Sequence, residues 1–213
     1  MTVAVLEGHD ALRRRLVLAV EADDELHVVA EGRDAASAAE ACAELQPRCV
    51  VVSGDDSSVA VAEARAVCPG AAVVLVITPR DADEAVAGLR AGARGFVNRA
   101  ATGQLPAVVR AVVGGAVALP PLLAGALADS GGRPAEPEPA LSGDERGVLR
   151  QLAAGRSYGA AAAAVGIPEA RARALVAGVV DRFQASSEPA GRAPCVVGEG
   201  HGPNRGEGAG SDR

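Results

Sequence analysis

The segment CVVVSGDD (residues 49–56) runs from a short apolar stretch into two acidic residues. Its first part, CVVVS, contains no alternating polar positions, which is typical of a β-strand buried on both faces. Such strands occur in parallel sheets that are covered by helices on both sides. We expect this strand to end at Ser53, so that Gly54, Asp55 and Asp56 follow in a loop.

Apolar runs and helical patterns alternate along the chain around this strand. The pattern predicts strands at 2–6, 25–31, 49–53, 72–78 and 93–98, and helices at 11–22, 35–45, 58–68, 81–92 and 103–115. This alternation predicts an α/β fold with a doubly wound, five-stranded parallel sheet in the flavodoxin-like strand order. In such sheets the chemistry lies at the carboxyl ends of the strands. The residues expected there are Glu7, Gly8, Ser53, Thr78 and Arg99.

The second part of the chain has a different organisation. A short helix is predicted at 120–128, and the Pro- and Gly-rich segment around 129–140 reads as a flexible linker. Three helical patterns follow from Leu141, the first with Ser142 and Glu145 at capping-box spacing. We therefore predict a first domain at 1–127, a linker at 128–140, a small all-α domain at 141–185 and a disordered tail at 186–213.

Composition excludes several classes of function. Aromatic residues make up 1% of the chain, so stacking on bases is not expected, and all 21 basic residues are arginine. The four cysteines have no CxxC or histidine partner at metal-binding spacing. Neither a signal peptide nor an apolar run of membrane-spanning length is evident. We find no Ser-His-Asp arrangement or phosphate loop, and therefore expect a cytoplasmic protein that is no enzyme and has no cofactor, no metal site and no membrane contact.

Several strings resemble one protein family. They are VAVLEGHDAL, ELQPRCVVVS, VLVIT, GLRAGARGFVNRA, LSGDERGVLRQLAAGRS and AVGIPEARARALV. Residues 1–127 resemble the receiver domain of two-component response regulators, and residues 141–183 resemble the LuxR-type helix-turn-helix that follows it in one subfamily. GLRAGARGF, at its spacing from VLVIT, is the most specific part. The resemblance implies a receiver-like sheet followed by a DNA-binding module.

The resemblance also indicates a degenerate phosphorylation site. Receivers hold Mg²⁺ with two adjacent acidic residues and a phosphoacceptor aspartate; here Glu7 and Gly8 match the acidic pair and Ser53 matches the acceptor. Arg99 matches the usual lysine, and only Thr78 is unchanged. A serine hydroxyl without an adjacent base is a weak nucleophile, and Mg²⁺ prefers carboxylate oxygens. We therefore expect a pseudo-receiver, which keeps the scaffold without the phosphorylation chemistry.

Alternatives remain open at this site. Asp55 or Asp56 could replace the acceptor, although phosphoryl transfer depends on positioning; otherwise they are loop acids, with Asp56 or Ser57 capping the next helix. Arg99 could pair with Glu7 or with an acidic residue at 81–84, or its guanidinium could hold an anionic ligand. Glu7 and Thr78 could also be ordinary strand-end residues.

In a helix-turn-helix the second helix of the motif enters the major groove, and by position that helix is 168–183. The resemblance places Arg171 and Arg173 toward DNA, where arginine binds guanine or phosphate. It places Ser157 and Tyr158 near phosphate, at the start of the preceding helix. The residues expected to face the three-helix core are Ile167, Leu175, Val176, Val179 and Val180.

Other features weaken the DNA-binding interpretation. Ala160–Ala164 offer no polar side chains, Glu169 would repel phosphate, and Arg171 and Arg173 could be ordinary solvated charges. The main hypothesis is a DNA-binding transcriptional regulator that works without phosphorylation. Its partners would be double-stranded DNA, an unknown ligand or protein, and a second copy bound through the receiver-like domain. The alternative is an interaction or scaffold protein whose helix-turn-helix no longer binds DNA.

Overall fold

The computed structural model describes residues 1–78, 82–129 and 139–186. Its five strands are β1 (Thr2–Leu6), β2 (His27–Gly32), β3 (Cys49–Val52), β4 (Ala72–Ile77) and β5 (Gly95–Asn98). They form one parallel sheet in the order β2-β1-β3-β4-β5. This confirms the predicted doubly wound fold. The segment CVVV forms the central strand, and every one of its side chains is buried.

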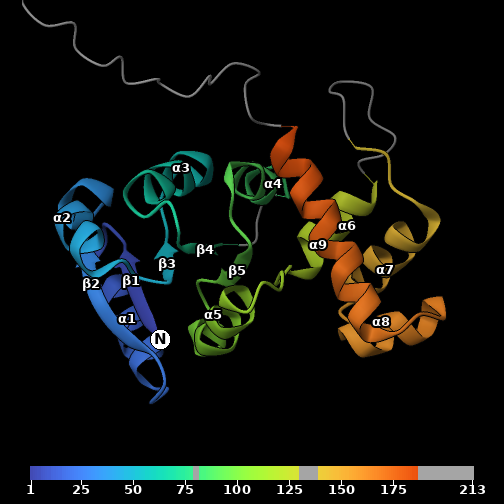
Figure 1. The fold of residues 1–213 in the computed structure, drawn as a ribbon, viewed down its shortest axis with the longest axis horizontal. Coiled ribbons are helices and arrows are strands. Elements are labelled where there is room, and N and C mark those ends of the chain that lie inside the picture. The colour runs from blue at the N-terminus through green and yellow to red at the C-terminus, as the bar shows by residue number, and fades with distance from the viewer. Residues whose placement is uncertain (79–81, 130–138, 187–213) are drawn as a thin grey trace, which may run out of the picture.

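Helices cover both faces of the sheet (Figure 1). The five helices are α1 (Asp10–Glu21), α2 (Ala35–Leu45), α3 (Ser57–Val67), α4 (Ala82–Ala91) and α5 (Leu105–Val113). Alternate strand residues point to opposite faces, so Val51 packs with α1 and α5 while Val50 and Val52 pack with α2, α3 and α4. The predicted helix at 103–115 is shorter than expected, because a 3₁₀ turn, η1 (Thr102–Gln104), precedes α5.

The second part of the chain consists of α6 (Pro121–Asp129), α7 (Gly143–Ala153), α8 (Tyr158–Val165) and α9 (Glu169–Ala185). Helix α6 contacts both α4 and α7, and α9 also contacts α4. One apolar cluster therefore continues from the sheet into the helical module. Because α6 runs to Asp129, it includes the first residues of the predicted linker. The domain boundaries stay predictions, and 130–138 and 187–213 lie outside the described residues.

Local signals in the sequence place several helix ends. The Ser142 hydroxyl accepts a hydrogen bond from the Glu145 amide, and the Glu145 carboxylate accepts one from the Ser142 amide, which confirms the capping box. Asp56, one of two candidates, caps α3. Gly166 ends α8 with a φ of 78°, a left-handed conformation that suits glycine.

The buried face of α9 differs from the prediction at one position. Val176, Val179 and Val180 are buried as expected, but Leu175 is only half-buried and lies outside the core cluster. Ala172 and Phe183 complete the buried face instead. Ala172 lies four residues before Val176 and Phe183 four after Val179, at the centre of this face, whereas Leu175 lies at its margin. Within the described residues, no helix combines the length and apolar character needed to cross a membrane.

Candidate functional site

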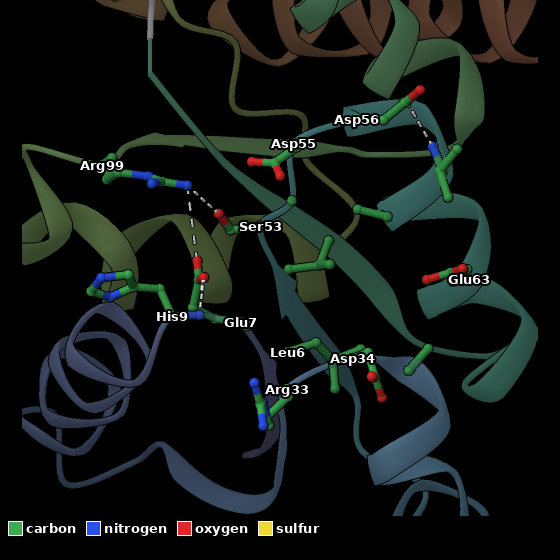
Figure 2. A pocket seen from close by; sticks show the side chains of 16 residues that line it. Leu6, Glu7, His9, Arg33, Asp34, Ser53, Asp55, Asp56, Glu63 and Arg99 are labelled. Atoms are coloured by element: carbon green, nitrogen blue, oxygen red, sulfur yellow. Dashed lines mark hydrogen bonds and ion pairs between the residues drawn. The ribbon is translucent and has the colours of Figure 1, made fainter.

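A crevice of about 570 Å³ opens at the carboxyl ends of β1 and β3 (Figure 2). The chain connections leave these two strands in opposite directions along the sheet, which is where open α/β sheets bind ligands. Its charged and polar lining residues come from four segments: Glu7 and His9 after β1, Arg33 and Asp34 before α2, Ser53, Asp55, Asp56 and Glu63 around α3, and Arg99 after β5.

Arg99 joins the ends of three strands. Its backbone amide donates to the carbonyl oxygen of Ile77 at 2.8 Å, which fixes it beside the end of β4. Its Nη2 donates to the Ser53 Oγ at 2.8 Å and lies 4.0 Å from Glu7 Oε2. Glu7 and Ser53 are 5% and 7% exposed, so Arg99 places a positive charge over two buried polar groups. Figure 2 shows the three side chains pointing toward one another.

Glu7 is only partly satisfied by these contacts. Its Oε1 accepts a hydrogen bond from the His9 amide at 2.7 Å. Its Oε2, and the Nε of Arg99, are buried without a hydrogen-bond partner. Of the alternatives considered for Arg99, the pairing with Glu7 is therefore present, as a loose ion pair. No group of three or more His, Cys, Asp or Glu side chains in the described residues could hold a metal ion.

The structure separates the roles of Asp55 and Asp56. Asp56 Oδ1 accepts hydrogen bonds from the hydroxyl and amide of Ser58 and from the Val59 amide, at 2.7, 2.9 and 3.1 Å. These bonds, the Ser58 hydroxyl first, lower the pKa of Asp56. Asp55 is exposed at the rim of the crevice. Asp56 is thus a helix cap, as expected of a loop acid.

The crevice brings together most of the residues predicted for the degenerate site. Glu7, Gly8, Ser53 and Arg99 line it, whereas Thr78 is exposed at the end of β4 and does not. Arg33 and Asp34 were not predicted to lie there. Asp34 caps α2 by accepting a hydrogen bond from the Ser37 amide. The spacing of Asp34 and Ser37 at the start of an alanine-rich helix is a capping signal that could have placed this segment.

The residues predicted to contact DNA differ in their surroundings. Ser157 caps α8, its Oγ accepting a hydrogen bond from the Ala160 amide. The Tyr158 hydroxyl donates to the Val117 carbonyl at 2.9 Å, and burial raises the pKa of Tyr158 to about 12. Arg173 is bound to Glu169 and lies over the Tyr158 ring. Arg171 is exposed and makes no hydrogen bond or ion pair with the residues that the structure describes.

Comparisons with known proteins give structural matches. No family model matches the chain, and a search of curated proteins returns no match. The RcsB response regulator of Salmonella typhimurium, in a structure concerned with conformational dynamism for DNA interaction, aligns with a TM-score of 0.53 and 17% identity over 86% of this chain and 91% of its own. A LuxR-family two-component response regulator from Aurantimonas sp. SI85-9A1 aligns with a TM-score of 0.53 and 23% identity, over 61% and 96%.

The isolated receiver (REC) domain of RcsB from Salmonella enterica serovar Typhimurium, determined with the phosphomimetic BeF₃⁻, aligns with a TM-score of 0.50 and 17% identity. It covers 58% of this chain and 95% of its own. The chain therefore has the fold of a response regulator, a receiver-like sheet followed by a helical module.

Proposed function

We propose that this chain, which has the response-regulator fold, is a DNA-binding transcriptional regulator whose receiver-like domain is not switched by phosphorylation. The observation that carries the proposal is the position of Ser53. It stands at the end of β3, where the resembled family has its phosphoacceptor, and its hydroxyl accepts a hydrogen bond from Arg99.

Two chemical arguments support loss of phosphorylation. A serine hydroxyl needs a base to become a nucleophile, and Arg99, which faces Ser53, is a donor that cannot take up a proton. Binding of Mg²⁺ relies on carboxylate oxygens; Gly8 removes one of the two matched acids, and the remaining acid, Glu7, is paired with Arg99. In this proposal the guanidinium takes over the role of the missing cation and links the three strand ends.

The output module supports binding to double-stranded DNA. Helices α8 and α9 are arranged as a helix-turn-helix, and Arg171 and Arg173 project from the exposed amino-terminal half of α9. Arginine in this position contacts base edges or phosphate. The structurally similar RcsB has been studied for its interaction with DNA. We further propose that the protein acts in the cytoplasm, without catalytic activity, and that any dimer forms through the receiver-like domain.

Fluorescence anisotropy with labelled duplex DNA tests this proposal. The full chain is expected to bind, with an affinity that acetyl phosphate and Mg²⁺ do not alter. Arg171→Ala/Arg173→Ala is expected to weaken binding strongly, because each lost phosphate or base contact costs affinity. Arg14→Ala/Arg48→Ala removes the same charge from the receiver-like domain and serves as the matched control. Equal binding by the two double variants would refute the assignment of α9 as recognition helix.

The composition of α8 favours a second candidate function. Ala160–Ala164 give this helix no side chain that could hydrogen-bond phosphate, and Arg173 is already engaged by Glu169. These features suit an interaction protein whose helix-turn-helix no longer binds DNA. Absence of duplex binding by the folded full chain at low salt, where phosphate contacts are strongest, would support this candidate over the first.

A further inference from the structure

Tyr158 contacts a part of the receiver-like domain that the sheet holds in place. The segment after α5 runs beside the edge strand β5: the Ala118 amide donates to the Arg94 carbonyl at 3.0 Å, and the Phe96 amide donates to the Ala118 carbonyl at 3.1 Å. These bonds fix the backbone next to Val117. The Val117 carbonyl accepts the hydrogen bond of the Tyr158 hydroxyl at 2.9 Å, so the sheet edge and α8 are directly joined.

The ring of Tyr158 supports Arg173. The guanidinium carbon of Arg173 lies 4.5 Å from the ring centroid, within the range of a cation–π contact. The Nε and Nη2 of Arg173 also donate to Glu169 Oε1 at 3.0 and 2.6 Å. Arg173 is therefore held from two sides, whereas Arg171 has no such contact with the described residues.

Helix α9 docks on the receiver-like domain through its carboxyl-terminal half (Figure 1). Asp181 pairs with Arg94 at 2.7 Å, and the Gln184 Nε2 donates to the carbonyl oxygens of Leu89 and Ala93 at 3.1 and 3.2 Å. One face of the amino-terminal half is left uncovered, since Glu169, Ala170, Arg171, Arg173 and Ala174 are all exposed. Docking of this kind leaves the proposed DNA-binding positions open.

We propose that Tyr158 is a positioning residue, which holds Arg173 in its DNA-binding orientation and makes that orientation depend on docking of the helical module against the receiver-like domain. The inference rests on the proposed function, because it assigns a DNA contact to Arg173. It replaces the direct phosphate contact expected of Tyr158 from the sequence: a phenol has one proton to donate, and the Val117 carbonyl takes it. Docking of the helical module on the receiver-like domain is thus expected to strengthen DNA binding.

The first test uses the only tyrosine of a chain without tryptophan, so that intrinsic fluorescence reports on Tyr158 alone. Arg94→Gln/Gln184→Ala removes the polar docking contacts of α9 without touching Tyr158 or the exposed arginines of α9. We expect quenching of the tyrosine by acrylamide to increase in this variant, at neutral pH and without DNA. Arg48→Gln, an exposed arginine of the receiver-like domain, is the control and should leave quenching unchanged. Unchanged quenching in the docking variant would overturn the link between docking and Tyr158.

The second test measures the affinity for a fluorescein-labelled duplex of random sequence at one fixed salt concentration. Tyr158→Phe keeps the ring and loses the hydroxyl; we expect about three- to tenfold weaker binding, the effect of one hydrogen bond. The docking variant should lose a similar factor, and the combination should lose no more than either, because both act through docking. Additive losses of affinity would show that Tyr158 contacts DNA directly. Tighter binding by the docking variant would show that docking masks α9. Either result overturns the proposal.

Failure of the proposed function is distinguishable from failure of this inference. If the folded full chain and all variants bind no duplex DNA, the DNA-binding function is refuted, and the role of Tyr158 in presenting Arg173 falls with it. The quenching experiment is independent of DNA and would still show whether Tyr158 anchors the helical module.

Discussion

Arg99 reaches from the end of β5 across the ends of β1 and β3, and its guanidinium meets the hydroxyl of Ser53 and the carboxylate of Glu7. At the scale of single residues, the proposed loss of phosphorylation rests on this contact. A hydroxyl that accepts a hydrogen bond from a guanidinium, which cannot take up a proton, is poorly suited to attack phosphorus. The same guanidinium compensates a carboxylate that would otherwise be buried without a counter-charge.

Phosphorylation is the most direct test at this scale. Acetyl phosphate with Mg²⁺ is expected to leave the intact mass of the protein unchanged. Gly8→Asp/Ser53→Asp/Arg99→Lys restores the residue types of the resembled family and is the positive comparison. A Cβ added at Gly8 would meet the Arg33 carbonyl oxygen at 3.5 Å, an ordinary contact, so the acid can be accommodated. A stable acyl phosphate on Asp55 of the unaltered chain would contradict the pseudo-receiver interpretation.

Loss of the Arg99 side chain should destabilise the sheet. Arg99→Ala leaves the Ser53 hydroxyl without this donor and Glu7 without its ion-pair partner, and both groups are buried. Since the arginine side chain is 42% exposed, solvent moderates the loss, and we expect the free energy of unfolding to fall by about 1–3 kcal/mol. Urea denaturation measures it. Arg48→Ala, on the surface, should change the free energy of unfolding by less than about 0.5 kcal/mol. Equal losses in the two variants would argue against a stabilising role of the Arg99 contacts.

At the scale of secondary structure, the capping box of α7 is the clearest example of a local signal with a distant consequence. Glu145 accepts from the Ser142 amide through Oε2 and from Arg182 of α9 through Oε1 at 2.7 Å. Helix α7 is thereby tied to α9, the last helix of the described chain. Ser142→Ala is expected to lower the free energy of unfolding by about 0.5–2 kcal/mol, measured by chemical denaturation with the exposed Arg48→Ala change as a comparison. No loss would mean that the cap is not formed in solution.

The same carboxylate predicts a dependence of stability on pH. Burial opposes ionisation of Glu145, but hydrogen bonds from Ser142 and Arg182 outweigh it and lower its pKa below the ordinary value of 4.5. A group whose pKa is lowered by folding contributes stability above its unfolded pKa and loses that contribution as pH falls through the folded pKa. The melting temperature of the unaltered chain should therefore fall between about pH 5 and pH 3, the range around the ordinary pKa of a glutamate. Over the same range the melting temperature of Glu145→Gln should fall less. Parallel pH profiles would contradict this.

Most elements could be predicted because their signals are local. The helix predicted at 35–45 has the bounds of α2, since Asp34 precedes it and an alanine-rich pattern fills it. The contacts that define the site could not be predicted in the same way. Ser53 and Arg99 are 46 residues apart, and Tyr158 and Val117 are 41 apart. No periodicity indicates which carbonyl a tyrosine hydroxyl will meet, so Tyr158 was expected at phosphate and is found on Val117.

At the scale of the whole molecule, the receiver-like sheet and the helical module share one apolar cluster, with α6 between them. Gln184 adds polar contacts to this interface near the end of the described chain. Truncation after Ser186 is expected to leave the melting temperature unaltered, because the composition of the removed segment predicts no packed structure. Truncation after Phe183 removes Gln184 and should lower it. Differential scanning calorimetry compares the two, and equal melting temperatures would argue against the docking contact.

Genome-wide mapping of the tagged full-length protein tests the central claim most directly. We expect discrete binding sites that disappear in Arg171→Ala/Arg173→Ala and persist in Arg14→Ala/Arg48→Ala. The same sites should be occupied in cells that lack phosphodonors. A flat profile from folded, expressed protein, or sites that survive the loss of both α9 arginines, would contradict it.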